Sequence, residues 1–299
     1  MRLRRSELST PGSSPRMMAK AAASAADFVL LDLEDAVAPN EKETARTHVI
    51  QALQTLDWGK KTRAVRVNDL ESEYAYKDII TVVEEAGELL DILILPKIKA
   101  ARDVWWADTL LTQVEKHCGL TRRIGLEVLI EEVEAMLNVE EIARASTRLE
   151  ALIFGPGDYS ASQGVDSRGI EGNLADYPGD LWHYARNKIA IAARAAGIDA
   201  IDGAYADFKN PAGYESECRR ARALGFVGKW AIHPSQIEIA NRIFSPSAED
   251  VAYARRLDTA YTEALAQGQG AIAFEGKMVD AAIVRSYKNI LAKADLIGM

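Results

Sequence analysis

Eight short runs of apolar and β-branched residues recur up to about residue 234 of this 299-residue chain, and a stretch able to form a helix follows each run. Strands that alternate with helices in this way are typical of βα units around a parallel sheet. Eight such units are enough to close a barrel, so the sequence predicts an α/β fold of the (β/α)8 barrel type. The expected strands are Ser6–Thr10, Phe28–Leu33, Ala64–Val67, Ile92–Leu95, Ile124–Ile130, Ala151–Phe154, Ala200–Ile201 and Phe226–Ile232.

Polar or charged residues follow nearly every one of these runs at its C-terminal end. Enzymes with this barrel assemble their active sites at the C-terminal ends of the strands. A doubly wound open sheet would not need eight equivalent ends, so the pattern favours a closed barrel that carries a catalytic site. In chain order the ends read Pro11-Gly12-Ser13, Asp32-Leu33-Glu34-Asp35, Arg66 with Asn68, Pro96-Lys97, Glu131, Gly155-Pro156-Gly157-Asp158, Asp202-Gly203 and His233-Pro234.

The residues after Phe244 lie outside the eight units. Ser245-Pro246-Ser247 is typical of a helix N-terminus and predicts a helix through about Ala266. A glycine-rich link then leads into an expected hairpin over Ala271–Val279, turning at Glu275-Gly276, and a final helix. We therefore expect a barrel domain over residues 1–244 and a helical C-terminal segment over residues 245–299, which can pack on its own barrel or reach a neighbouring subunit.

The charge balance and the cysteines narrow the class of protein. A net charge of −8 and a pI near 5.2, without a stripe of lysine or arginine, argue against a nucleic-acid partner. No apolar segment follows the basic start, so we expect neither a signal peptide nor a membrane span, and a cytoplasmic location. Cys118 and Cys218 lack the spacing of a zinc site or a disulfide framework, and we expect them to serve packing.

Glu131 and Asp158 stand at the ends of the fifth and sixth runs. In a barrel, these neighbouring ends would bring the two carboxylates together at the catalytic face. Hard oxygen ligands of this kind suit Mg²⁺, which commonly takes one or two carboxylates and leaves its other positions to water and substrate. The alternative is that Glu131 complements a helix N-terminus and Asp158 caps a turn.

Two cations also stand at run ends. Arg66 closes an apolar run, where it can bind a carboxylate or stabilise a developing enolate oxygen. The alternative is an ion pair with the acidic residues at the end of the second run, and both roles can hold together. Lys97 is placed to form a Schiff base as a desolvated nucleophile, although a structural or phosphate-facing lysine is more common, and the carboxylate pair favours a metal mechanism.

The segment Pro11–Arg16, followed by Lys20 on an expected helix, places backbone N–H groups, hydroxyls and cations where phosphates can bind. Its glycine does not belong to a Walker or Rossmann pattern, and an ordinary loop and helix start is the more common explanation of such a segment. His233 is a lone histidine at a run end, and we expect it to line the pocket rather than to act as a catalyst.

Seven motifs, in this order, resemble those of the malyl-CoA lyases in the citrate lyase β-subunit-like, or HpcH/HpaI aldolase, family. The resemblance extends over almost the whole chain, from Arg5 to Asp280. No single motif suffices, but their order and spacing argue against a chance match. The motifs are DLEDAV at 32–37, RVN at 66–68, LEVLIE at 126–131, FGPGDYSAS at 154–162, YPGDLWHY at 177–184, IDG at 201–203 and GKWAIHPSQI at 228–237.

This resemblance implies Mg²⁺ as cofactor, with Mn²⁺ as a substitute, and a homo-oligomer, a trimer or hexamer, in which the C-terminal segment caps a neighbour's active site. By motif, Glu131 and Asp158 match the metal ligands. Arg66 matches the substrate-binding arginine, and Asp280 matches the acid/base delivered from the adjacent subunit. An acyl-CoA substrate is the implied partner, and its implied contacts are Ser9, Ser14, Lys20, Gly157, Ile232 and His233. The residues implied to support these and the metal ligands, without contacting the substrate, are Glu34, Asp35, Asn68 and Lys97.

The implied reaction is reversible Claisen-type cleavage of L-malyl-CoA to acetyl-CoA and glyoxylate, and of β-methylmalyl-CoA to propionyl-CoA and glyoxylate. Citramalyl-CoA cleavage and malyl-CoA hydrolysis by a thioesterase are alternatives, because they differ from this reaction by a methyl group or by the admission of water. One methyl group changes binding in a pocket by only about 1–3 kcal/mol. A citrate lyase β-subunit that works on an acyl-carrier partner is a less favoured alternative, because the GDLWHY segment is more similar to that of the stand-alone lyases.

A catalytically silent CoA-binding subunit is a remoter alternative, because it would not need all of the matched catalytic and metal-binding residues. The segment Asp202–Asp207 departs from the DGPFGDF of many relatives. Because this segment is expected at the edge of the pocket, the departure leaves the preferred acyl group undetermined.

Overall fold

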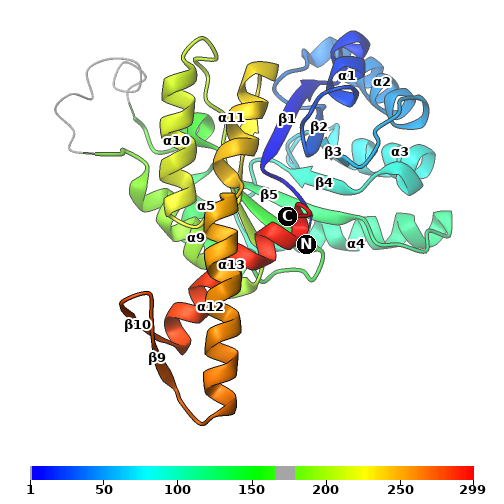
Figure 1. Cartoon of the computed structure of the whole chain (residues 1–299). Coiled ribbons are helices and arrows are strands. Elements are labelled where there is room, and N and C mark those ends of the chain that lie inside the picture. The colour runs from blue at the N-terminus through cyan, green and yellow to red at the C-terminus, as the bar shows by residue number, and fades with distance from the viewer. Residues whose placement is uncertain (1, 166–178) are drawn as a thin grey trace. The chain divides into compact units, whose positions relative to one another are not determined.

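The computed structural model describes residues 2–165 and 179–299, and within them eight parallel strands close into a barrel in sequence order (Figure 1). The last strand returns to the first, where Ser6 pairs with Lys229. The predicted (β/α)8 barrel is therefore confirmed. The strands are β1 Ser6–Pro11, β2 Phe28–Asp32, β3 Thr62–Arg66, β4 Ile92–Leu95, β5 Gly125–Ile130, β6 Leu149–Phe154, β7 Asp199–Asp202 and β8 Gly228–Ala231.

Every predicted run overlaps one of these strands, and the differences lie at the strand ends. β7 is longer than the predicted Ala200–Ile201, because it includes an aspartate at each end. Both aspartates are paired with buried cations: Asp199 lies 3.2 Å from Arg4, and Asp202 lies 2.6 Å from Lys229. Apolar periodicity alone does not mark such positions as strand.

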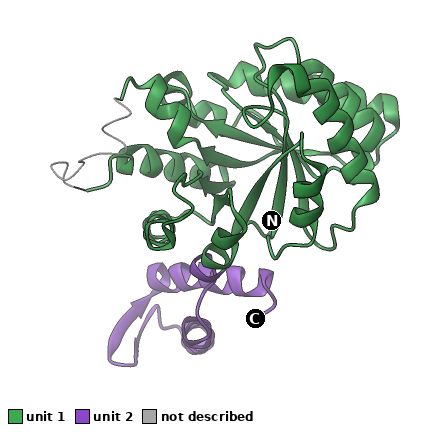
Figure 2. Cartoon of the chain, turned by 90° about the horizontal axis from the view of Figure 1, so that it is seen from above, with its two compact units in different colours: residues 1, 3–241 green, residues 2, 242–299 purple. Residues whose placement is uncertain are grey.

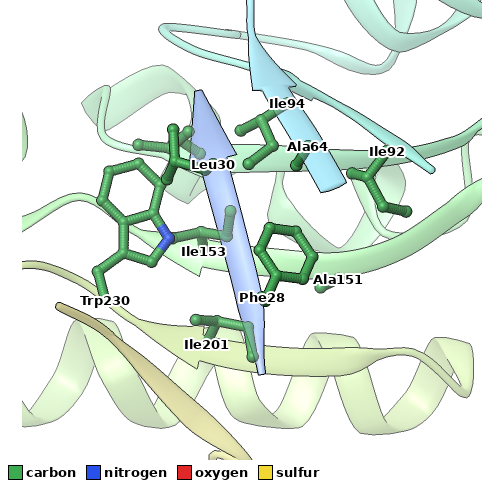
Figure 3. Close-up of a cluster of buried hydrophobic side chains, with 10 residues drawn as sticks. Phe28, Leu30, Ala64, Ile92, Ile94, Ala151, Ile153, Ile201 and Trp230 are labelled. Atoms are coloured by element: carbon green, nitrogen blue, oxygen red, sulfur yellow. The ribbon is translucent and has the colours of Figure 1, made fainter. Parts of the chain in front are cut away.

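Side chains at alternate positions of the strands fill the interior of the barrel (Figure 3). Because side chains alternate across a strand, the inward row of β2 runs from Phe28 through Leu30 to Asp32. The inward row of β3 likewise ends at Arg66. The apolar interior therefore leads directly into charged residues at the C-terminal end of the barrel. The buried cluster comprises Phe28, Leu30, Ala64, Ile92, Ile94, Leu129, Ala151, Ile153, Ile201 and Trp230.

Helices follow the strands, and several begin or end at residues that favour such positions. Ser14 caps α1 by accepting a hydrogen bond from the Met17 N–H, and Asn210 caps α10 through the Gly213 N–H. Gly119 ends α4 in the left-handed conformation. The helices of this part are α1 Pro15–Ala22, α2 Lys42–Thr55, α3 Ala75–Ala86, α4 Ala101–Cys118, α5 Val133–Leu137, α6 Val139–Ile142, α7 Pro156–Ser162, α9 His183–Ala196, α10 Pro211–Ala223 and α11 Pro234–Phe244, with short 3₁₀ turns η1 Pro39–Glu41 and η2 Gly87–Leu89.

Residues 3–241 form one compact unit, and residue 2 together with residues 242–299 forms a second (Figure 2). The second unit contains α12 Ala248–Ala266, β9 Ala271–Phe274, β10 Lys277–Asp280 and α13 Ala281–Leu296. The predicted cap at Ser247 is present, since its Oγ accepts a hydrogen bond from the Asp250 N–H at 3.0 Å. In the part of the chain that the structure describes, no helix has the length and apolar character needed to cross a membrane.

The predicted hairpin is also present in the second unit. β9 and β10 pair antiparallel across Glu275 and Gly276, whose φ angles of 45° and 77° are both positive, as a tight two-residue hairpin turn requires. Val279 of the hairpin packs with Leu257 of α12 and Val284 of α13 in a small buried cluster. The unit thus has an apolar core of its own.

Candidate active site

Two acidic residues meet at the C-terminal ends of β5 and β6. Glu131 directly follows β5 and is 1% exposed, and Asp158 lies in the first turn of α7 and is partly exposed. Gly155 makes this arrangement possible, because a Cβ at that position would lie 2.5 Å from Glu131 Oε2. The glycine of the FGPGD motif therefore lets the end of β6 approach the buried carboxylate.

The Glu131 carboxylate has few partners for a buried charge. Its Oε1 accepts a hydrogen bond from the Lys97 N–H at 2.8 Å, while no group among the described residues donates to Oε2. Burial raises the pKa of Glu131 to about 8; Arg66 opposes the shift, and the negative charge of Asp158 adds to it. A bound cation would reverse this balance and stabilise the ionised form.

The donor set at this position fits a hard divalent cation. Residues 2–165 and 179–299 contain no group of three or more His, Cys, Asp or Glu side chains that could enclose a metal ion. Two carboxylates, one with an unpartnered oxygen, instead match the pattern in which Mg²⁺ keeps several positions for water and substrate oxygens. The chemistry of Glu131 and Asp158 therefore suits Mg²⁺ better than zinc, which prefers nitrogen and sulfur ligands.

Arg66 occupies the adjacent position at the end of β3. Asp32 binds its guanidinium in two places, with Nε to Oδ1 at 2.7 Å and Nη2 to Oδ2 at 2.6 Å, and Glu34 Oε2 lies 3.0 Å from Nη1. The ion pair considered as an alternative for this arginine is therefore present. These contacts leave further N–H groups on Nη1 and Nη2. Asp32 and Glu34 can therefore hold the guanidinium in place while Arg66 still donates to an oxygen of a ligand.

Lys97 links the two acidic regions of the site. Its backbone has a φ of 49°, which is uncommon for a residue other than glycine, and in this conformation its N–H reaches Glu131. Its Nζ contacts the Glu34 carboxylate and lies 2.9 Å from Asp35 Oδ1. Burial lowers the pKa of the Lys97 ammonium, but the two carboxylates outweigh burial and raise it above the usual value. A protonated ammonium is a poor nucleophile, so this environment does not favour the Schiff-base alternative.

Asn68 supports the loop that follows β3. Its N–H and its side-chain amide donate to Asp78 Oδ2 at 3.0 and 2.6 Å, and Arg46 binds Oδ1 of the same carboxylate. Lys42 performs a similar task for the DLED segment, since its Nζ donates to the carbonyl of Glu34 at 2.8 Å. Asp78 was not predicted from the sequence, where its only signal is an acidic residue on the apolar face of an expected helix.

The residues expected to contact CoA lie at the ends and outer loops of β1, β6 and β8. Ser9 is half-buried on β1, Ser14 caps α1, and Lys20 and Gly157 are exposed. Nothing described lies within 4 Å of a Cβ built on Gly157, so no close approach there requires a glycine.

Ile232 and His233 form the turn after β8. Both backbone N–H groups donate to the buried Gln236 Oε1, at 2.8 and 3.3 Å, so these N–H groups are already engaged within the chain. The imidazole of His233 stacks on Phe208 with ring centroids 4.9 Å apart, and its Nδ1 accepts from the Ser235 N–H at 3.2 Å. The side chain, rather than the backbone N–H groups, is therefore available to a ligand at this turn.

Comparison with known proteins shows the family to which this fold belongs. Residues 5–234 match the family model described as HpcH/HpaI aldolase/citrate lyase. The chain is 42% identical to L-malyl-CoA/beta-methylmalyl-CoA lyase of Cereibacter sphaeroides, over 98% of this chain and 95% of that protein. It is 38% identical to citrate lyase subunit beta of Haemophilus influenzae, over 98% of each chain.

A solved structure points to the same group of proteins. Protein CitE from Mycobacterium tuberculosis, in complex with magnesium, acetoacetate and coenzyme A, shares 29% identity over 97% of both chains, with a TM-score of 0.74. The fold and the acidic site thus define an aldolase or lyase of the (β/α)8 barrel class. The chain belongs to the HpcH/HpaI aldolase/citrate lyase family.

Proposed function

We propose that this protein is a Mg²⁺-dependent acyl-CoA lyase that cleaves L-malyl-CoA reversibly to acetyl-CoA and glyoxylate, and β-methylmalyl-CoA to propionyl-CoA and glyoxylate. The observation that carries the proposal is the buried Glu131 with Asp158 at its side and Arg66 next to it. This arrangement occurs in a chain that is 42% identical to a lyase named for both substrates.

The residues have distinct tasks in this reaction. Glu131 and Asp158 would hold Mg²⁺, which when bound polarises the carboxylate and hydroxyl oxygens of the substrate. Arg66, held by Asp32 and Glu34, would donate hydrogen bonds to the thioester oxygen as enolate charge develops on it. Because Asp32 and Glu34 fix the guanidinium before substrate arrives, little reorganisation is needed during cleavage.

Asp280 would return a proton to the enolate carbon, or remove it in the condensation direction. Within the second unit, Asp280 Oδ1 caps α13 by accepting from the Ala282 and Ile283 N–H groups, both at 3.1 Å. No described residue donates to Oδ2, so the capping role leaves one oxygen for proton transfer. We propose that Asp280 acts on the site of a neighbouring subunit in a homo-oligomer, a trimer or hexamer, because it lies beyond the eight βα units.

The CoA moiety would be bound along β1 and α1 and at the turn after β8. Ser14, which caps α1, and Lys20 on α1 offer a hydroxyl and an ammonium, and His233 offers an imidazole N–H, since its Nδ1 already accepts a hydrogen bond. These groups suit the phosphates of a nucleotide. Ser9, on the inner side of the same region, would lie nearer the thioester, and Gly157 would border it across the barrel mouth.

Product analysis tests the function directly. Malyl-, β-methylmalyl- and citramalyl-CoA would each be incubated with the protein and Mg²⁺ or Mn²⁺, following glyoxylate or pyruvate alongside free CoA. We expect glyoxylate from the first two substrates and no free CoA. Free CoA without a new acyl-CoA would identify a thioesterase, and preferential pyruvate release would identify a citramalyl-CoA lyase.

Subunit mixing tests the shared site. Glu131→Ala and Asp280→Asn should each be nearly inactive alone, whereas mixed oligomers should contain sites with an intact metal pair from one subunit and an intact Asp280 from another. Activity in verified mixtures should rise well above both parents. Mixed oligomers that remain as inactive as the parents would place Asp280 in its own subunit's site.

A further inference from the structure

A buried ionic network lies outside the barrel wall, between β7 and β8 on one side and α9 and α10 on the other. Arg186 and Lys229 are 1% and 0% exposed, and both bind Asp202, at 2.8 and 2.6 Å. Glu217 of α10 lies 2.9 Å from the Lys229 Nζ. Buried charges of this kind are costly to desolvate and add little stability compared with apolar packing, so a network this deep points to a role in geometry.

One arm of the network reaches the start of α7 through Gly203. Lys229 Nζ donates to the Gly203 carbonyl at 2.7 Å. Gly203 in turn packs so closely on the Phe154 carbonyl and the Pro156 ring that a Cβ would overlap both. Pro156 is the first residue of α7, and Asp158 follows two residues later. The position of Lys229 is therefore transmitted by direct contact to the turn that carries Asp158.

The second arm reaches α7 through an aromatic cluster. Arg186 Nη1 binds both carboxylate oxygens of Asp180, at 2.9 and 2.7 Å, and Asp180 accepts from the Trp182 N–H at 3.1 Å. Trp182 packs edge-on against Tyr159, the neighbour of Asp158, with ring centroids 5.5 Å apart. The Arg186 guanidinium also lies 5.5 Å over the Phe154 ring. Arg186 thus supports Phe154 at the end of β6 directly and, through Asp180 and Trp182, Tyr159 within α7.

Helix α7 needs this support. It has seven residues and no side-chain cap at its N-terminus, and a helix this short is not stable by itself. Its C-terminal end is tied down by the Ser162 hydroxyl, which contacts Glu132 Oε2 at 2.7 Å. The N-terminal turn with Asp158 instead depends on Gly203 and the aromatic cluster.

We infer that Arg186, coupled through Asp202 to Lys229, is a positioning residue that sets the location of Asp158 in the metal site. The inference rests on the proposed role of Asp158 as a Mg²⁺ ligand. In this role Arg186 would act through its contacts with Asp180 and Asp202, without touching substrate or metal. Its planar fork is required, because a lysine ammonium cannot bind both carboxylates with the same geometry.

Mn²⁺ binding by the apo protein, measured from the loss of the free-ion EPR signal, tests this without relying on turnover. Arg186→Lys should raise the Mn²⁺ dissociation constant about tenfold, within the range seen when groups that orient metal ligands are removed. In the cleavage assay, excess Mg²⁺ should restore most of the lost rate. An unchanged dissociation constant in folded Arg186→Lys overturns the inference.

Arg148→Lys provides a matched control. Arg148 has a side chain 1% exposed and binds Asp108 and Glu115 at 2.6 and 2.5 Å, but it precedes β6 and so lies at the opposite end of that strand. Both variants should lower the melting temperature, whereas only Arg186→Lys should weaken Mn²⁺ binding. An equal loss of Mn²⁺ affinity in Arg148→Lys would show a general effect of destabilisation and overturn the inference.

Two further variants extend the Mn²⁺ measurement. If Arg186→Lys does not fold, Asp180→Asn replaces it, because it weakens the second arm without leaving a deeply buried cation alone; unchanged Mn²⁺ affinity in that variant overturns the inference. Asp158→Asn tests the metal site itself, separately from the role of Arg186. If Asp158→Asn binds Mn²⁺ normally, the proposed metal site is wrong. If Mn²⁺ affinity falls in Asp158→Asn but not in Arg186→Lys, the proposed metal site stands and the inferred role of Arg186 is overturned.

Discussion

The two ends of the barrel carry similar groups in different settings. At the C-terminal end, Arg66 lies among Asp32, Glu34 and Glu131. At the N-terminal end, Arg4 contacts three carboxylates and lies near a fourth; they are Glu127, Glu150, Asp199 and Glu7. Trp230 belongs to both regions, since Arg66 lies 5.5 Å over its ring and its Nε1 donates to Glu7 at 2.9 Å.

The two ends differ in where their carboxylates lie relative to the strands. At the N-terminal end all four stand on strands, which hold them together around Arg4. At the C-terminal end, Glu34, Asp35 and Asp158 follow the strands, Asp35 is exposed to solvent and Asp158 is partly exposed. A buried excess of carboxylates is therefore not enough to indicate a metal site. Access from solvent, and carboxylates that lie beyond the strand ends, distinguish the end that can exchange a cation and a substrate.

We call the N-terminal end, where strands hold the carboxylates around Arg4, the closed end, and the C-terminal end the open end. Removing Arg4, the central cation of the closed end, should have the largest effect on stability. Arg4→Met removes the cation that pairs with the fully buried Glu127 and lies near the fully buried Glu7, and we expect a loss of about 3–5 kcal/mol in the free energy of unfolding at neutral pH. Urea unfolding followed by circular dichroism measures this loss. A loss below about 1 kcal/mol would mean that the carboxylates do not depend on Arg4.

The closed end should also make stability depend on pH. Burial raises the pKa of Glu127 from 4.5 to about 7, with Arg4 opposing the shift and Glu150 adding to it. The folded state therefore binds more protons than the unfolded state between these values, so this contribution is complete below about pH 4.5 and is lost as the pH rises through about 7.

Glu127→Gln should flatten that fall in stability, by up to about 1.4 kcal/mol for each pH unit. Unfolding free energies measured from pH 5 to pH 8 for the parent and the variant provide the comparison. Parallel pH curves for the two proteins would contradict the raised pKa.

A smaller effect should identify backbone strain at the open end. Lys97→Gly and Lys97→Ala both remove the ammonium that pairs with Glu34, but only glycine adopts a φ of 49° at low cost. We expect the glycine variant to be more stable than the alanine variant by about 1–2 kcal/mol, the reverse of the usual order. Thermal unfolding of the two variants side by side measures the difference. Equal stability, or a more stable alanine variant, would contradict the left-handed backbone.

The sequence predicted the open end better than the closed end, for a physical reason. Glu131 and Asp158 follow adjacent apolar runs, and parallel strands bring such ends together regardless of detail. Glu7 and Glu127 lie inside apolar runs, and their partner Arg4 precedes the first strand; only an out-of-place charge in a strand hints at the cluster. The support from Arg186 was also not predicted, because its contacts join residues far apart in the sequence whose side chains leave no periodic pattern.

The φ of Lys97 was not predictable either. Lysine has no preference for the left-handed region, and this conformation follows from the combined attraction of Glu131 for its N–H and of Glu34 and Asp35 for its ammonium. Similarly, the sequence left open whether Arg66 pairs with the acidic residues of the second strand end. In the structure Asp32, continuing the inward row of β2, is the residue that binds it in two places.

Paired glutamine substitutions on the same strand test the central claim most directly. Glu127 and Glu131 both lie on or directly after β5 and are both buried, one at each end of the barrel. Mn²⁺ binding and malyl-CoA cleavage would be measured for Glu127→Gln and Glu131→Gln, with folding checked by circular dichroism. We predict that Glu131→Gln loses Mn²⁺ binding and slows cleavage by about a hundredfold or more, whereas Glu127→Gln retains both. Folded Glu131→Gln protein that binds Mn²⁺ and cleaves malyl-CoA like the parent would contradict the account.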